Sequence, residues 1–155
     1  MRIAVFSDSH GRMHNCLRAM ELAGPIDYII HLGDTVRDTE DLGIVYPDTP
    51  IIYVCGNCDF CAGVDTEKVI ELGGKRLFLY HGHTRGVKAG LRELAHCAKG
   101  ADLVLFGHTH EAFDGMEDGI HLFNPGSISL PACGAPSFGL LTIEGDQLTV
   151  EHRNI

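Results

Sequence analysis

One local pattern recurs along the sequence: a short apolar run that leads to Gly, His, Asp or Asn. The runs cover residues 3–6, 28–30, 51–54, 77–80 and 103–106. Short continuous apolar runs between glycines and polar residues are typical of strands that are buried on both faces. We therefore expect an α/β chain, and if these strands lie side by side in one sheet, the polar groups collect along one edge.

Open α/β sheets bind their ligands at the carboxyl ends of the strands. Seven side chains would meet there: Asp8, His10, Asp34, Asn57, His81, His108 and His110. Taken singly, each is explained as well by a cap or a turn. His108 and His110 alternate in an extended segment, so both rings can approach one point when the chain turns. The order of the groups, one after each strand, favours a single metal site.

In these blocks the chain resembles the calcineurin-like metallophosphoesterase superfamily, from residue 1 to about residue 128. The blocks read Asp8-Ser9-His10, Gly33-Asp34, Gly56-Asn57-Cys58-Asp59, His81-Gly82-His83 and Gly107-His108-Thr109-His110. The short chain, with Cys58 where the superfamily has His, is similar to the small phosphodiesterase branch that also contains the retromer-subunit scaffold. The resemblance implies a two-sheet β-sandwich flanked by helices, in α-β-β-α order, with residues 1–155 as a single domain.

The resemblance also implies two metal ions. Carried over by position, one ligand set is Asp8, His10, Asp34 and His110, and the other is Asp34, Asn57, His81 and His108. Asp34 would bridge the two metals. Mixed imidazole and carboxylate ligands suit divalent Mn, Fe, Zn, Ni or Co, and manganese is expected first; an oxygen-only cage for calcium or magnesium is not visible.

Two such cations would activate a water and clamp a phosphoryl group, so no nucleophilic Ser or Cys is required. We therefore predict hydrolysis of a small phosphodiester. In the superfamily the His of the third block is thought to protonate the leaving group, and Cys58 stands there in this chain. A thiol beside a dication tends to lose its proton. His83 is the local alternative acid, and a rim histidine bonded to the backbone stays open as its other interpretation.

Further polar residues flank the ligand blocks. Arg12 and Arg85 could contact the substrate phosphate together with Asn57, although solvated surface arginines fit the pattern equally well. Asp59 is expected to support a ligand or to stabilise a turn. Turn chemistry alone explains the segment 124–127, which also recurs near the site in similar chains.

Three alternatives stay open at this point. The chain could be a catalytically weak protein-interaction scaffold like the retromer subunit, or a phosphomonoesterase, although all seven ligand positions are filled. Cys55, Cys58 and Cys61 form C-x2-C-x2-C, part of an iron–sulfur signature. The fourth Cys followed by Pro, which completes that signature, is missing.

The composition limits the classes of binding partner that we expect. A formal charge of −9 and a pI near 5.4 argue against general nucleic-acid binding, which depends on basic contacts to phosphate. No apolar run approaches 18 residues and no signal-peptide pattern opens the chain, so we expect no membrane association and a cytoplasmic location. A small phosphoester substrate is the expected partner, and a homo-oligomer stays open.

The remaining segments predict the supporting elements. Apolar stripes predict helices over residues 14–23 and 87–98, and a third segment over 38–45 is also expected to be helical. Alternating residues at 120–123, 138–143 and 147–151 predict strands, with a hairpin turn at Gly145-Asp146. These later strands predict a second, partly antiparallel sheet.

Overall fold

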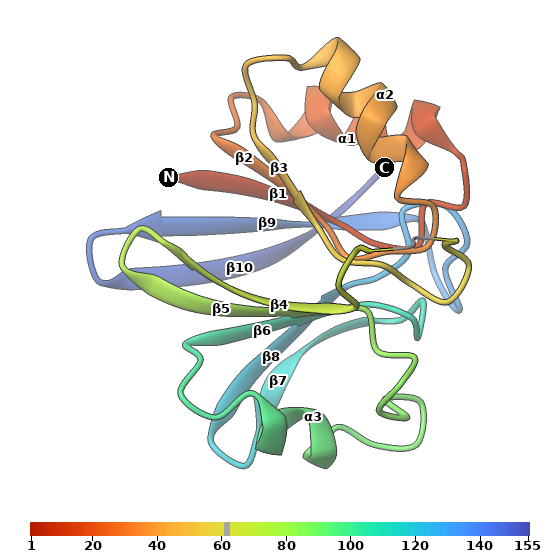
Figure 1. Cartoon of the computed structure of the whole chain (residues 1–155). Helices are drawn as coiled ribbons and strands as arrows, with labels where there is room; N and C mark the ends of the chain where they lie inside the picture. The colour runs from red at the N-terminus through yellow and green to blue at the C-terminus, as the bar shows by residue number, and fades with distance from the viewer. Residues whose placement is uncertain (61–62) are drawn as a thin grey trace.

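The computed structural model describes residues 1–60 and 63–155, and Figure 1 shows two sheets between helices. The elements are β1 (Arg2–Phe6), α1 (Met13–Ala23), β2 (Tyr28–His31), α2 (Arg37–Val45), β3 (Ile51–Tyr53), β4 (Glu67–Leu72), β5 (Lys75–Tyr80), α3 (Arg92–Cys97), β6 (Leu103–Phe106), β7 (Ala112–Glu117), β8 (Ile120–Pro125), β9 (Ser137–Glu144) and β10 (Gln147–Asn154).

Each sheet has five strands. The first has the order β10-β9-β1-β2-β3, and the second has the order β4-β5-β6-β8-β7. The strands β1, β2 and β3 are mutually parallel, as are β5, β6 and β8, while the outer pairs are antiparallel. The predicted two-sheet sandwich is confirmed. The five strands that lead to the candidate ligands do not share one sheet: β1, β2 and β3 lie in the first, and β5 and β6 lie in the second.

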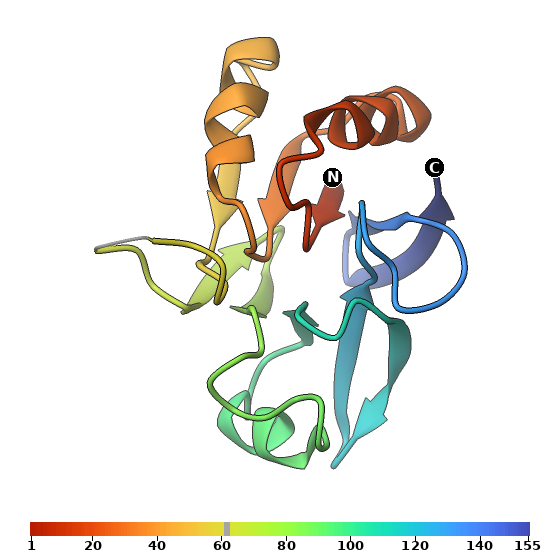
Figure 2. The same ribbon diagram turned by 90° about the vertical axis from the view of Figure 1, so that its right-hand side faces the viewer.

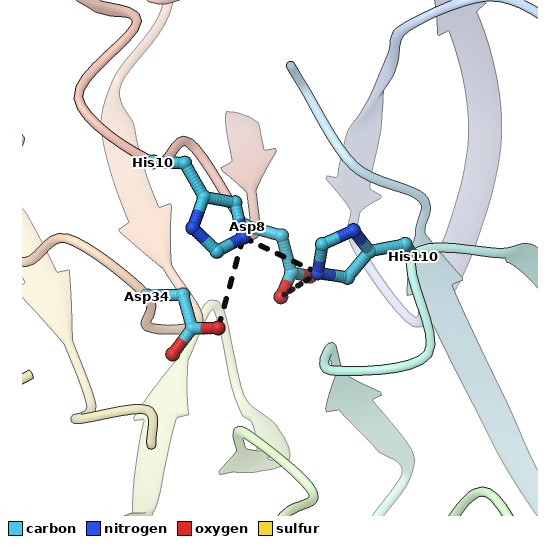
Figure 3. A group of neighbouring side chains, drawn as sticks. All are labelled: Asp8, His10, Asp34 and His110. Carbon is cyan, nitrogen blue, oxygen red and sulfur yellow. Dashed lines mark hydrogen bonds and ion pairs between the residues drawn. The ribbon is translucent and has the colours of Figure 1, made fainter. Parts of the chain in front are cut away.

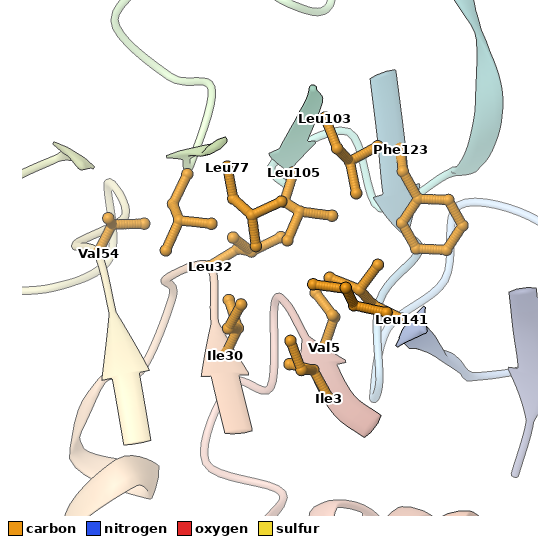
Figure 4. Close-up of a cluster of buried hydrophobic side chains, with 12 residues drawn as sticks. Ile3, Val5, Ile30, Leu32, Val54, Leu77, Leu103, Leu105, Phe123 and Leu141 are labelled. Atoms are coloured by element: carbon orange, nitrogen blue, oxygen red, sulfur yellow. The ribbon is translucent and has the colours of Figure 1, made fainter. Parts of the chain in front are cut away.

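The main core lies between the sheets, and the period-2 geometry of strands explains it. In β1, Ile3 and Val5 face the other sheet, whereas Ala4 and Phe6 face the helices. Figure 4 shows the inter-sheet cluster. It consists of Ile3, Val5, Ile30, Leu32, Val54, Leu77, Leu79, Leu103, Leu105, Phe123, Leu141 and Ile143. Both faces of the central strands are therefore buried, which is why their sequences read as unbroken apolar runs.

Helices cover the outer faces. In Figures 1 and 2, α1 and α2 lie over the first sheet and α3 lies over the second. The predicted helices 14–23 and 38–45 are confirmed to within one residue. The prediction for 87–98 is wrong in its first half, because Gly86 (φ 59°) and Gly90 (φ 158°) adopt conformations outside the helical region. Val87 is nevertheless buried, so this apolar residue reflects packing in the core and not a helix.

Two strands had no prediction. Strand β4 is half-buried and mixes charged and apolar residues without a regular alternation, and β7 is a half-exposed edge strand that contains Gly115. None of the helices in residues 1–60 and 63–155 is long and apolar enough to cross a membrane.

Candidate metal centre

The candidate ligands come from both sheets and meet where the parallel strands of the two sheets end. Asp8 and His10 follow β1, and Asp34 follows β2, whereas His110 follows β6 of the second sheet. The candidate site is therefore built from residues of both sheets. The seven predicted residues fall into two groups that share Asp34.

The first half of the site consists of Asp8, His10 and His110 together with Asp34. Their nearest nitrogen and carboxylate oxygen atoms all lie within 4.8 Å of one another. His110 Nε2 lies 3.2 Å from Asp8 Oδ1 and 3.3 Å from His10 Nε2, and His10 Nε2 lies 3.8 Å from Asp34 Oδ2. Figure 3 shows the four side chains pointing toward one centre, a geometry that can hold a metal ion.

The second half consists of Asn57, His81 and His108, again with Asp34. His81 Nε2 lies 3.2 Å from Asn57 Oδ1 and 3.4 Å from Asp34 Oδ1. The ring centroid of His108 lies 5.1 Å from that of His81. The two carboxylate oxygens of Asp34 thus face different halves: Oδ2 lies toward His10, and Oδ1 lies toward His81.

Backbone strain is concentrated in these residues. Non-glycine residues with a positive φ are uncommon, and such outliers gather at functional sites. In the described part of the chain they are Asp8, His10, Asp34, Thr35, His108, His110 and Asp118. All but Thr35 and Asp118 are predicted ligands, and Thr35 directly follows one. The chain turns sharply at the strand ends, and those turns aim the side chains inward.

The glycines of the sequence blocks permit close packing around the ligands. A Cβ on Gly33 would lie 2.5 Å from the nitrogen of Gly56 and 2.8 Å from His81 Nδ1. A Cβ on Gly107 would collide with the hydroxyl of Ser7. These positions therefore exclude larger residues on steric grounds.

Asp59 holds the loops that carry Asp34. Its Oδ2 accepts backbone N–H bonds from Asp34 (2.9 Å) and Gly56 (2.8 Å), and its Oδ1 accepts bonds from Thr35 and Val36 (both 2.8 Å). Four bonds to one carboxylate fix the β2 loop relative to the β3 loop. This agrees with the supporting role expected for Asp59.

Two serines hold the backbone of Asp8. Ser127 Oγ and Ser129 Oγ donate to the carbonyl of Asp8, at 2.8 and 2.9 Å. Asn124 Nδ2 donates to the carbonyl of Gly107 at 3.1 Å and to the hydroxyl of Thr109 at 3.0 Å. The segment 124–127 thus supports the site directly, which turn chemistry did not reveal.

His31 is a buried supporting residue that sequence reasoning missed. Its Nδ1 accepts a bond from the N–H of Gly33 (3.2 Å), so the neutral ring carries its proton on Nε2 and donates to Ser9 Oγ (3.0 Å). Ser9 in turn donates to the carbonyl of Asp34 at 3.2 Å. The signal was a histidine that ends an apolar strand two residues before Gly33.

The orientation of two imidazoles fits metal binding. His81 Nδ1 lies 2.7 Å from the carbonyl of Leu32, and His110 Nδ1 lies 2.6 Å from the carbonyl of Leu130. A carbonyl can only accept, so each Nδ1 carries a proton and each Nε2 faces the site, where its lone pair can bind a metal once the ring is neutral. Asp8 Oδ1 is buried beside His110 Nε2 (3.2 Å), and a cation at this place would take over from the proton between them.

The electrostatics of the halves differ. Burial by itself raises the pKa of Asp8, but the bond from His110, the field of His81 and the Ser7 hydroxyl outweigh burial and lower it. The Asp8 carboxylate raises the pKa of His110. Burial and the neighbouring His81 lower the pKa of His108 to about 4.

The two predicted catalytic residues border the second half. The Nδ1 of His83 is buried without a hydrogen-bond partner, and its ring centroid lies 5.4 Å from that of His81. Burial and His81 lower the pKa of His83. Cys58 is exposed, its N–H donates to Asp34 Oδ1 at 2.9 Å, and burial together with Asp34 raises the pKa of its thiol. Cys61 lies outside the described residues, and Cys55 is disulfide-bonded, so Cys55 offers no free thiolate to a three-cysteine site.

The two arginines are placed differently. Arg85 forms an ion pair with Glu67, with its Nη2 2.5 Å from Oε2, and its guanidinium lies 5.6 Å from the ring centroid of Tyr80. The side chain of Arg12 is exposed and makes no contact with the ligands in the described residues. The structure therefore does not bring Arg85 to the ligands, and the substrate roles of both arginines stay predictions.

The sequence matches a known family. The calcineurin-like phosphoesterase superfamily domain matches residues 1–146. The chain is 34% identical to a Bacillus subtilis protein named "Probable metallophosphoesterase YsnB", over 97% of this chain and 89% of that protein. It is 27% identical to a phosphodiesterase of Methanocaldococcus jannaschii, over 93% of this chain and 94% of that protein.

Solved structures have the same fold. A conserved Streptococcus pneumoniae protein, described as a predicted phosphoesterase, has a TM-score of 0.79 at 29% identity and matches 99% of this chain and 88% of that one. Wild-type Vps29 of Entamoeba histolytica, complexed with zinc, has a TM-score of 0.76 at 22% identity and matches 100% of this chain and 98% of that one. The second likeness shows the fold alone.

Proposed function

Because the chain belongs to the calcineurin-like phosphoesterase superfamily, and is therefore a metal-dependent hydrolase of phosphoric esters, we propose that it hydrolyses a small phosphodiester with two divalent metal ions. The proposal takes residues 1–155 as one domain and the cytoplasm as its place of action. The two metals are divalent transition metals, and manganese is the one that we expect to be bound.

One observation carries the two-metal proposal: the carboxylate of Asp34 faces two groups of ligands. Its Oδ2 lies 3.8 Å from His10 and its Oδ1 lies 3.4 Å from His81. A carboxylate with an imidazole near each oxygen suits a bridge between two cations. In support, His81 turns its Nε2 into the site on one side, as His110 does on the other, because each Nδ1 faces a backbone carbonyl.

The residues of the chain bind and orient the reacting groups. Two divalent metals bound here supply an activated water and the positive charge that stabilises the phosphoryl group in an in-line displacement. The strained turns and Asp59 hold the carboxylates and imidazoles in place before the substrate arrives. Departure of the alcohol requires a proton or a good leaving group, and His83 and Cys58 border that side of the site.

Two alternatives are tested against this proposal. A scaffold needs only the fold, whereas the complete set of seven candidate ligand positions favours hydrolysis. A phosphomonoesterase would use the same centre, and the choice depends on whether a second ester group is accepted. The diester is favoured because the M. jannaschii relative is named a phosphodiesterase.

The experiment measures metal and activity together. We expect purified protein to retain close to two divalent metal ions per chain after manganese loading, as determined by elemental mass spectrometry. We also expect it to hydrolyse bis(p-nitrophenyl) phosphate faster than p-nitrophenyl phosphate. Bound metal without hydrolysis of either ester would favour the scaffold. A higher rate with the monoester would favour the phosphomonoesterase.

A further inference from the structure

A cavity of about 630 Å³ opens beside the second half of the candidate metal centre. Two of its lining residues, Thr35 and Cys58, directly follow the candidate ligands Asp34 and Asn57 in the chain. Small-molecule sites span roughly 300 to 1,000 Å³. The cavity therefore has the size for the part of a substrate that lies beyond its phosphate.

The lining combines an aromatic ring with unused polar groups. The side chain of Phe60 is fully exposed, with a relative exposure of 106%. The guanidinium of Arg37 and the hydroxyl of Tyr53 make no hydrogen bond or ion pair within residues 1–60 and 63–155. Glu40 adds a carboxylate acceptor. A free ring beside both donors and an acceptor is suited to a flat, polar ring system.

The cavity wall is fixed relative to the metal ligands. Thr35 is β-branched and has a φ of 85°, a costly conformation that its surroundings must enforce. The N–H groups of Thr35 and Val36 donate to Asp59, the same carboxylate that holds the N–H of Asp34. A group bound in the cavity would therefore lie at a defined position relative to the phosphate.

We propose that this cavity binds the ester group that stays on the phosphate, and that this group is a nucleoside. Phe60 stacks on the base, and Arg37 and Tyr53 donate hydrogen bonds to its acceptors. A plain aryl group would use the ring of Phe60 but would leave the polar groups unused. This inference rests on the proposed phosphodiesterase function.

The test uses three diesters that share p-nitrophenol as the leaving group. They are the p-nitrophenyl esters of methyl phosphate, phenyl phosphate and thymidine 5′-phosphate, so differences in kcat/KM report only the retained group. With the manganese-loaded full chain we expect thymidine to exceed methyl by about tenfold or more, because stacking of a base on an aromatic side chain supplies that much. Phenyl should lie between them.

Variants assign the preference to the cavity. Phe60→Ala should lower both the phenyl-to-methyl and the thymidine-to-methyl ratios, whereas Arg37→Ala should lower only the thymidine ratio. Arg92→Ala is the matched control, because Arg92 is an exposed arginine that lines a separate cavity with Thr84 and Glu117. The phenyl-to-methyl and thymidine-to-methyl ratios of Arg92→Ala should equal those of the wild type.

The outcomes are distinct. Equal kcat/KM values for the three diesters would overturn the inference, as would a thymidine preference that survives both Phe60→Ala and Arg37→Ala. Equal values for phenyl and thymidine would reject the nucleoside in favour of any flat ring. Hydrolysis of none of them would instead count against the proposed function. In that case, calorimetry measures the binding of thymidine 5′-phosphate, phenyl phosphate and methyl phosphate to the manganese-loaded protein. These affinities show whether the cavity recognises a nucleoside, and equal affinities would overturn the inference.

Discussion

The two halves of the candidate metal centre share Asp34 but differ in how their other side chains are held. In the first half, Asp8 is fully buried and its carbonyl accepts bonds from Ser127 and Ser129, while His110 donates to the carbonyl of Leu130. In the second half His81 is equally fixed, since it is buried and donates to the carbonyl of Leu32, but its two other members are held more loosely. Asn57 is exposed there, and the ring of His108 makes no hydrogen bond within the described residues.

The difference indicates two degrees of preorganisation. Side chains that are fixed before binding lose less conformational freedom when they take up a metal ion. We therefore expect the first half to bind its metal more tightly, and the second half to become ordered as its metal and the substrate bind. The cavity beside Cys58 borders this second half, where differences between substrates would have the greatest effect.

The largest expected effect comes from the residue that both halves share. We predict that Asp34→Asn removes measurable hydrolysis and lowers bound metal at both halves, because the amide lacks the charge that compensates two cations. The same measurements on His110→Ala should show loss of hydrolysis with metal lost mainly from the first half. Hydrolysis and metal content are measured together, so lost metal is separated from lost chemistry.

Asp114→Asn is the matched control for Asp34→Asn. Asp114 pairs with His121 at 2.7 Å on the partly exposed β7–β8 hairpin, so the same change there should alter neither metal content nor rate. Wild-type activity in a fully loaded Asp34→Asn protein would reject the two-metal assignment.

Cys58 provides the second test, which is confined to the second half. Without a histidine at this position, we expect diesters with acidic phenol leaving groups to react far faster than alkyl ones. Cys58→His should raise the rate for poor leaving groups by up to about 100-fold, the lower range of general acid catalysis. Cys58→Ser should keep bound metal and most activity.

The measurement is the dependence of the chemical step on leaving-group pKa. A flat dependence in the wild type would show that a general acid, with His83 as the candidate, already acts. Loss of metal in Cys58→Ser would instead show that the Cys58 thiolate binds the metal.

The sequence predicted the residues of the site better than their arrangement. The apolar runs predicted the strands because both of their faces are buried, but the choice of sheet depends on pairing between distant segments. The segment 87–98 shows the same limit, since Val87 is buried without being helical. Composition gave no sign that Arg85 would pair with Glu67, because the ion pair joins a loop to β4.

The supporting residues were the least predictable part. Ser129 donates to the carbonyl of Asp8, and His31 acts on the carbonyl of Asp34 only through the hydroxyl of Ser9. A carbonyl acceptor leaves no trace in the sequence. Asp59 was detectable because it stands beside Asn57 in a recognised block. Local blocks therefore reveal candidate ligands, whereas contacts across the sandwich are visible only in the fold.

The third prediction compares the supports of the two halves. Asp59→Asn should lower metal affinity and activity by roughly tenfold, the mild end of the range for residues that hold ligands, because an amide keeps one acceptor but turns its NH2 toward two N–H donors. Ser129→Ala should have a smaller effect, because Ser127 still donates to the carbonyl of Asp8. Equal effects in calorimetric metal titrations would contradict the difference in preorganisation.

The smallest expected effect concerns pH, which should shift the balance between the halves. In the metal-free protein the hydrogen bond that His110 donates to Asp8 raises the pKa of His110, whereas burial and His81 lower the pKa of His108 to about 4. A metal must displace the proton of His110 below that raised pKa, so affinity at the first half should fall by up to about tenfold per pH unit there. His108 is already neutral between pH 5 and 8 and adds no such competition.

The same shift makes a prediction for stability with the opposite sign. A histidine whose pKa is raised on folding stabilises the metal-free protein fully below its unfolded value near 6.5, and that contribution is lost as the pH rises through the raised value. Metal-free stability from the pair of His110 and Asp8 should thus decline with rising pH while metal affinity increases. Histidine ring signals in an NMR titration provide the measurement. A measured pKa below 6.5 for His110, or above 6.5 for His108, would contradict the expected order of the two pKa values. The electrostatic difference between the halves would then be absent.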